Sequence, residues 1–146
     1  MSLHESESGL LNEQYFRAAL PNRVATARRV LRPISVVLAR IGSPQYARQV
    51  AYALLDTLRE SDTACRLDDG GFALILEDTP ENGAVWTIER LRRLLTEQGI
   101  EVIVWAGVAS YPAHALEAPA LVALAEGALV AAQEWQQSRI EVALPE

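Results

Sequence analysis

Lysine is absent from this chain, and all thirteen basic residues are arginines. The chain therefore has no lysine ammonium with which to neutralise a triphosphate, and the planar fork of arginine suits a different geometry. Nineteen acidic residues bring the net charge to −6 at pH 7. No basic stripe runs along the sequence, which argues against a nucleic-acid partner.

Cysteine and histidine are scarce as well. Cys65 is the only cysteine, so the chain can form no internal disulfide and no cysteine zinc cluster. His4 and His114 lack metal-ligand spacing, and we expect neither a metal nor a cofactor. We also expect no membrane span, because no apolar run reaches about 18 residues, and the polar, acidic N-terminus does not resemble a signal peptide. These absences together predict a reducing, cytoplasmic setting.

The composition that remains is typical of one globular domain. Half of the 146 residues are hydrophobic and 22% are charged. A domain of this length buries roughly two-thirds of its unfolded surface, which is enough for a core. We expect residues 1–9 to be a disordered lead-in or linker and residues 10–146 to form the domain.

Hydrophobic periodicity divides the domain into helices and strands. We expect a first helix from Asn12 to about Leu31, with an interruption at Pro21. The further elements expected are a strand at 34–38, a helix at 45–60 after an N-cap at Ser43, strands at 64–67 and 72–76, a helix from an N-cap at Thr79 to Gly99, a strand at 100–109, a helix at 118–136 and an edge strand at 139–142. This order predicts an α+β fold in which helices cover a sheet.

Several sequence landmarks follow one another at fixed distances. Arg59 and Asp62 supply an R-x-x-D motif, Arg66 follows after three residues, and Phe72 closes the next hairpin. Further landmarks are Gly9-Leu10-Leu11-Asn12, Gly107-Val108-Ala109 and Tyr111-Pro112. From about residue 9 to residue 143 the chain resembles a GGDEF (diguanylate cyclase) domain. The resemblance implies a nucleotidyl-cyclase-like palm with a central, mostly antiparallel sheet covered by helices, and a place in bacterial cyclic di-GMP signalling.

The same resemblance implies that the catalytic residues are lost. Members of the family hold divalent metals with carboxylates at the end of the first sheet strand and in the signature. Here the strand-end positions are Arg40 and Gly42, and the signature reads Asp68-Asp69-Gly70-Gly71-Phe72. About a dozen residues that read guanine and wrap the phosphates in the family are missing between Gly42 and Gln45. We therefore expect a degenerate domain that is not an enzyme, with Asp68 and Asp69 as turn formers rather than metal ligands.

One ligand site of the family is matched. Arg59 and Asp62 correspond to the inhibitory site that binds cyclic di-GMP, and Arg90 aligns with a supporting position. Arginine can grip phosphate and guanine edges, and a carboxylate can accept from guanine N–H groups. The residues alone also permit a structural interpretation, in which Arg59 favours a helix C-terminus and Asp62 caps the next turn. Both side chains are expected at the surface.

Two functions remain open at this point. The first is a catalytically inactive signalling domain that acts in regulation or protein–protein interaction, as a homodimer or by docking onto an attached sensor or output domain. The second is a cyclic di-GMP receptor that uses Arg59 and Asp62. Titration with cyclic di-GMP separates the two.

Overall fold

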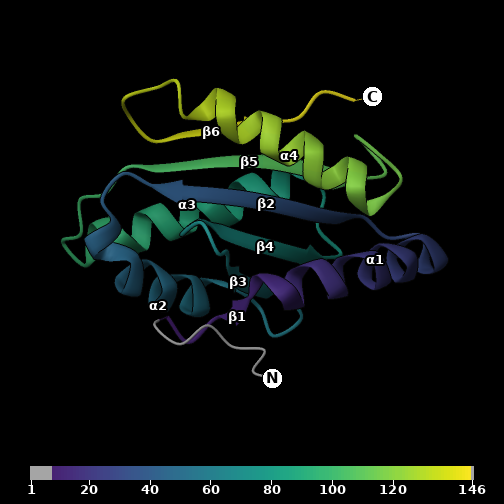
Figure 1. Cartoon of the computed structure of the whole chain (residues 1–146), viewed down its shortest axis with the longest axis horizontal. Coiled ribbons are helices and arrows are strands. Elements are labelled where there is room, and N and C mark those ends of the chain that lie inside the picture. The colour runs from purple at the N-terminus through teal and green to yellow at the C-terminus, as the bar shows by residue number, and fades with distance from the viewer. Residues whose placement is uncertain (1–7, 146) are drawn as a thin grey trace.

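Six strands form one mixed sheet in residues 8–145, the part of the chain that the computed structural model describes. In chain order the elements are β1 (Leu11–Asn12), α1 (Glu13–Val30), β2 (Ile34–Ile41), the 3-10 helix η1 (Pro44–Tyr46), α2 (Ala47–Thr57), β3 (Thr63–Arg66), β4 (Phe72–Glu77), α3 (Glu81–Glu97), β5 (Val104–Tyr111), α4 (Ala118–Ala132) and β6 (Arg139–Val142). Across the sheet the strand order is β1-β3-β4-β2-β5-β6 (Figure 1). The inner pairings are antiparallel, and the two outermost pairings, β1 with β3 and β5 with β6, are parallel. The sheet is therefore mostly antiparallel, as the resemblance implies.

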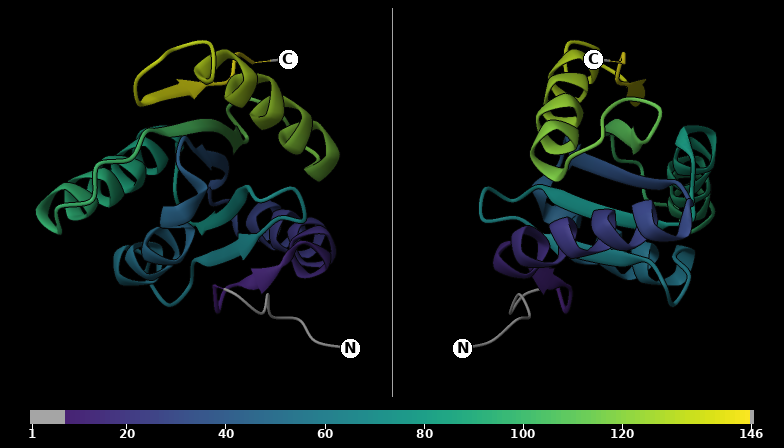
Figure 2. Two further views of the ribbon diagram at one scale, coloured as in Figure 1. Left: turned by 60° about the vertical axis from the view of Figure 1, so that its left-hand side comes forward. Right: turned by 90° about the vertical axis from the view of Figure 1, so that its right-hand side faces the viewer.

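Helices cover both faces of this sheet (Figure 2). Along β2, Ile34, Val36 and Leu38 are buried in a cluster with residues of α1 and α4. Val37 and Ala39 are buried in a second cluster, with residues of α2 and α3. Side chains alternate between faces along a strand, so a strand covered on both sides is apolar throughout. This explains why the run from residue 34 to residue 39 is apolar except for Ser35, whose buried hydroxyl is hydrogen-bonded to Thr79 and Ser110.

The first helix is continuous through Pro21, so the expected interruption is wrong. Asn12 caps the helix with its side chain, and Phe16, Leu20 and Val24 are buried along one stripe. Pro21 itself is exposed. A proline inside a helix costs roughly 3 kcal/mol, and packing of the apolar stripe on the sheet outweighs that cost.

Other boundaries differ where they depend on distant partners. The strand expected at 100–109 begins only at Val104, because Ile41, the last residue of β2, pairs with Val104 and the ladder ends there. The two-residue strand β1 was not expected from the sequence, and it pairs with β3. The N-cap of α3 is Pro80 rather than Thr79, and α2 ends at Thr57, before the expected end at Glu60.

Most of the expected lead-in, residues 1–7, lies outside the described residues. Ser8, which lies within the expected lead-in, is buried, and its hydroxyl accepts a hydrogen bond from the backbone N–H of Leu10 at 3.3 Å. Within residues 8–145 no helix combines the length and apolar character that a bilayer crossing needs.

Candidate functional site

The R-x-x-D motif lies in the turn that joins α2 to β3, and its two ends bind each other. Oδ2 of Asp62 accepts hydrogen bonds from the backbone N–H and the Nε of Arg59, at 3.0 and 3.2 Å, and Oδ1 accepts from Nη2 at 3.2 Å. The backbone N–H of Glu77 also donates to Oδ1, at 3.2 Å. The Asp62 side chain is 4% exposed, so the expectation that it lies at the surface is wrong. The carboxylate faces inward because it satisfies backbone donors of both the turn and β4.

The Arg59 guanidinium reaches from this turn to the end of β4. Nη2 donates to the carbonyl oxygen of Glu77 at 2.6 Å and to the hydroxyl of Thr79 at 2.7 Å. The hydrogen bond to Asp62 is the main reason that the pKa of Arg59 is raised above its ordinary value. The side chain is nevertheless 55% exposed, and Nη1 makes no hydrogen bond to any described residue. One edge of the guanidinium is thus open to solvent, and Arg59 lies at the surface as expected.

Arg90 lies apart from this network, on the exposed face of α3. It lines a shallow hollow of about 310 Å³ together with Arg93 and with Asp56 and Thr57 from the end of α2. Within residues 8–145 it makes no hydrogen bond or ion pair with Arg59 or Asp62. The structure therefore places Arg90 near the end of α2 but does not join the three candidate residues into one preassembled site.

The signature segment, Asp68–Phe72, begins in the turn between β3 and β4 and ends on the first residue of β4. The backbone N–H of Leu67 donates to the carbonyl of Gly71 at 2.8 Å, and the N–H of Gly70 donates back to the carbonyl of Leu67 at 3.0 Å. Gly70 has a φ of +90°, a conformation that favours glycine. Oδ1 of Asp69 accepts from the backbone N–H of Gly71 at 2.9 Å, which is the local bond of an aspartate that forms a turn.

Three contacts hold the tip of this hairpin in place. The backbone N–H of Asp68 donates to the carboxylate of Glu13 in α1 at 3.0 Å, and this bond lowers the pKa of Glu13 below its ordinary value. Nε of Arg66 donates to the carbonyl of Gly70 at 3.0 Å. The Arg66 guanidinium also lies 4.9 Å from the centre of the Phe72 ring, a cation–π contact. The hairpin is therefore anchored both to α1 and to its own strands.

Arg40, at the end of β2, forms an ion pair with Asp69 of the hairpin turn. Nη2 of Arg40 donates to Oδ2 of Asp69, and Nη1 donates to its backbone carbonyl at 3.4 Å. The sheet register explains the contact, because Ala39 pairs with Phe72 and brings the next residue of β2 beside the turn. The Asp69 carboxylate thus binds the Arg40 guanidinium and the backbone N–H of Gly71. No cluster of three or more His, Cys, Asp or Glu side chains that could hold a metal occurs among the described residues.

The connection between β2 and the first helical turn consists of Gly42 and Ser43 only. The backbone N–H of Gly42 donates to the carbonyl of Ile103 at 2.9 Å, and Pro44 begins η1. A side-chain carbon on Gly42 would approach the Cβ of Ile103 to 3.2 Å, so the chain passes close to the segment before β5. A connection of two residues therefore joins the strand end to the helical segment.

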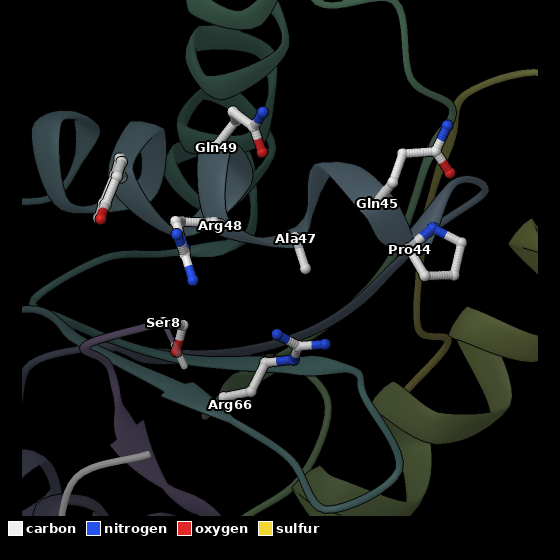
Figure 3. Close-up of a pocket in the computed structure, with 8 residues that line it drawn as sticks. Ser8, Pro44, Gln45, Ala47, Arg48, Gln49 and Arg66 are labelled. Carbon is white, nitrogen blue, oxygen red and sulfur yellow. The ribbon is translucent and has the colours of Figure 1, made fainter. Parts of the chain in front are cut away.

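A groove of about 450 Å³ opens beside the hairpin, between the start of α2 and the edge of the sheet (Figure 3). Figure 3 shows the guanidinium groups of Arg48 and Arg66 directed into this groove from α2 and from the end of β3. The sequence identified Arg66 only as a landmark, and Arg48 was missed. The signal for it is the exposed stripe formed by Arg48, Tyr52 and Leu55, which are spaced as neighbours on one face of α2.

Comparisons with known proteins agree with this architecture. The GGDEF domain of PA1120 (TpbB or YfiN) from Pseudomonas aeruginosa is 20% identical with a TM-score of 0.87, covering 96% of this chain and 94% of that one. The GGDEF domain of DgcB from Caulobacter crescentus, in complex with c-di-GMP, is 18% identical with a TM-score of 0.84, covering 97% and 96%. The diguanylate cyclase SiaD of Pseudomonas aeruginosa, in complex with its activator SiaC, is 20% identical with a TM-score of 0.82, covering 97% and 62%. At these identities the likeness shows a shared fold.

A family model gives the closer assignment. No curated protein matches the chain. The model described as "Diguanylate cyclase, GGDEF domain" matches residues 45–139, which is more than half of the chain and contains the hairpin, α3, β5 and α4. The chain therefore belongs to the GGDEF family and has the α+β, cyclase-like palm fold that its sequence implies.

Proposed function

We propose that this chain is a catalytically inactive GGDEF domain that acts in cyclic di-GMP signalling through regulation or protein–protein interaction. The ion pair between Arg40 and Asp69 is the main support for the proposal. Joining two GTP molecules requires divalent metal ions, which carboxylates hold and which neutralise the charge on the phosphates. A guanidinium at the strand end repels such an ion, and the carboxylate beside it is already paired with that guanidinium.

Two further features support the same proposal. Gly70 and Gly71 provide no side-chain ligand at the acidic positions of the family signature. Only Gly42 and Ser43 connect β2 to η1. A connection this short forms no loop whose backbone N–H groups could bind phosphates. Because the metal ligands and the phosphate-binding loop are lost together, no single compensating residue would restore the reaction.

An inactive domain acts through what it binds. The complex of SiaD with its activator SiaC is an example of a diguanylate cyclase that binds a protein partner. By analogy, the present chain is proposed to act by binding protein. It would form a homodimer or dock onto an attached sensor or output domain in the bacterial cytoplasm. A reducing compartment suits Cys65, a buried free thiol whose pKa burial raises to about 12.

The direct test is an assay for cyclic di-GMP synthesis. The purified chain is incubated with GTP and either Mg²⁺ or Mn²⁺, and nucleotides are separated and identified by mass spectrometry. An active diguanylate cyclase serves as the positive control and the heat-inactivated chain as the blank. We expect neither cyclic di-GMP nor the linear intermediate, and product above the blank refutes the proposal.

A cyclic di-GMP receptor is the second candidate function. The exposed Nη1 edge of Arg59 favours it, and the DgcB domain, which shares this fold, was solved in complex with c-di-GMP. Asp62 weighs against it, because its carboxylate is buried and already accepts four hydrogen bonds. To accept from guanine, Asp62 has to release at least one of these four donors, which come from the backbone of Arg59 and Glu77 and from the Arg59 side chain. We therefore rank the receptor function second.

Calorimetric titration with cyclic di-GMP decides between the two functions. A receptor would lose roughly ten- to a hundredfold in affinity on Arg59→Ala, because a charge-assisted hydrogen bond contributes roughly 1.5–3 kcal/mol. Arg93→Ala, which removes an exposed arginine from α3, is the matched control and should leave the affinity unchanged. Absence of binding in the wild type eliminates the receptor function, and equal affinity in wild type and Arg59→Ala eliminates this site.

A further inference from the structure

Most arginines of this chain are neutralised by an acidic neighbour. Within the described residues, eight of the thirteen form ion pairs with Asp or Glu. Arg48 forms no ion pair or hydrogen bond in this part of the chain, and Arg66 donates only its Nε, to a backbone carbonyl. Within residues 8–145 this groove thus holds two guanidinium groups without an acidic partner, on a chain whose net charge is −6.

The lining of the groove sets it apart from three other surface hollows. Those hollows combine Arg92 with Glu101, Arg17 with Glu126, and Arg90 and Arg93 with Asp56 and Glu97. Among residues 8–145, no Asp or Glu lines the groove of Arg48 and Arg66. A concave surface that carries one sign of charge focuses its electrostatic field and attracts groups of the opposite sign.

Arg66 is held in position before any partner arrives. Its Nε is hydrogen-bonded to the carbonyl of Gly70, and its guanidinium lies over the Phe72 ring. Figure 3 shows the terminal nitrogens of Arg66 directed toward the side of α2 that carries Arg48. Because the side chain is already ordered, binding an anionic group through its Nη atoms loses less conformational entropy than usual.

Apolar side chains continue the surface beyond the arginines. Tyr52 and Leu55 are 57% and 52% exposed and follow Arg48 along one face of α2. The groove is an open depression rather than an enclosed pocket. Sites for small molecules typically bury 70–90% of their ligand, so an open, mixed surface of this kind fits an extended segment of a protein better than a small ligand.

We propose that this groove is a docking surface for an acidic segment of a partner protein. Carboxylates of the segment would bind Arg48 and Arg66, and a neighbouring apolar side chain would pack against Tyr52 and Leu55. The inference rests on the proposed function, since it names the kind of partner that a non-catalytic domain binds.

The test uses a fluorescein-labelled peptide rich in Glu and Leu, and a matched peptide in which Gln replaces every Glu. Binding to the whole chain is followed by fluorescence anisotropy. We expect the acidic peptide alone to bind, with an affinity that falls as salt is added. Arg48→Gln and Arg66→Gln should each weaken binding roughly two- to fivefold, as expected for partly exposed charge pairs. Tyr52→Ser should also weaken it, whereas Arg93→Gln, on α3, should not.

Arg48→Gln is the decisive variant because it breaks no hydrogen bond within residues 8–145, whereas Arg66→Gln needs a thermal melt to show that the hairpin is intact. Equal affinity in wild type and Arg48→Gln, or no binding at all, overturns the proposal. The proposal is also overturned if the chain binds inorganic pyrophosphate through both arginines but does not bind the peptide. That result identifies a site for small anions instead. A cyclase assay on the same preparation separates the two proposals. Product refutes the inactive function, whereas no product and no peptide binding refute only the docking surface.

Discussion

Arg40 and Asp69, 29 residues apart in the sequence, form an ion pair where β2 ends beside the β3–β4 turn. Replacing Arg40→Asp removes the guanidinium and supplies a carboxylate at the strand end. We expect this variant, and its combination with Gly70→Asp, still to make no cyclic di-GMP, because Gly42 and Ser43 leave no phosphate-binding loop. Mass spectrometry of reactions with GTP and Mg²⁺ measures the outcome. Product from the double variant would show that the metal ligands were the only defect.

The buried carboxylate of Asp62 predicts a difference in stability within the R-x-x-D motif. Asp62→Ala leaves the backbone N–H groups of Arg59 and Glu77 without their acceptor, and we expect it to lower the free energy of unfolding by roughly 1–3 kcal/mol. Arg59→Ala removes a side chain that is more than half exposed and should lower it by about 1 kcal/mol or less. Urea denaturation measures both, with the exposed Asp56→Ala as a control that should change little. The opposite order would contradict the structural role given to Asp62.

The contact between Glu13 and the hairpin predicts a pH dependence. The hydrogen bond from Asp68 lowers the folded-state pKa of Glu13 below 4.5, so this carboxylate stabilises the fold fully above that pH. Its contribution is lost as the pH falls through the lower, folded-state pKa. The variant Glu13→Gln does not titrate, so the difference in unfolding free energy between wild type and variant should shrink as the pH falls below 4.5. Urea titrations at a series of pH values measure this difference, and a constant difference would refute the prediction.

Gly107 in β5 lies directly against the backbone of α4. A Cβ at this position would overlap the carbonyl oxygen of Ala125 and the backbone nitrogen of Leu129, so β5 and α4 would have to separate. We expect Gly107→Ala to lower the free energy of unfolding by roughly 3 kcal/mol. Gly127→Ala is the matched control. Its Cβ would meet no atom within 4 Å, and removing a glycine from a helix should raise stability by roughly 0.5–1 kcal/mol. Thermal denaturation measures both variants. A melting temperature of Gly107→Ala equal to or above that of the wild type would contradict the close approach of β5 and α4.

The sequence predicted those features of the fold that depend on local pattern. Buried strands and amphipathic helices show themselves in the spacing of apolar residues, which is why the runs at 34–38, 72–76 and 139–142 were identified. The two residues of β1 carry no periodicity, and they form a strand only because β3 lies beside them. The start of β5 at Val104 is likewise set by the length of β2, its partner. Sequence pattern missed these two features because long-range pairing sets them.

In the candidate site, too, the sequence identified residues by local pattern but not the contacts between them. The motif spacing identified Arg59 and Asp62, but spacing does not tell whether two side chains bind a ligand or each other. In the structure they bind each other and the end of β4. Arg40 was recognised at a strand-end position where the family has a metal-binding carboxylate, and Asp69 as a turn former. Their contact with one another depends on the register of β2 with β4. That register becomes visible only once the strands are paired.

The strand order places β1 and β6 at opposite edges of the sheet, so the two ends of the described chain leave the domain on opposite sides (Figure 1). An affinity tag or fluorescent protein joined after Pro145 would sit at the β6 edge, with the width of the sheet between it and the groove of Arg48 and Arg66. One joined just ahead of Ser8 would sit against the groove, because Ser8 is part of its lining. Surface-tethered binding measurements on this domain should therefore attach it through its C-terminal edge.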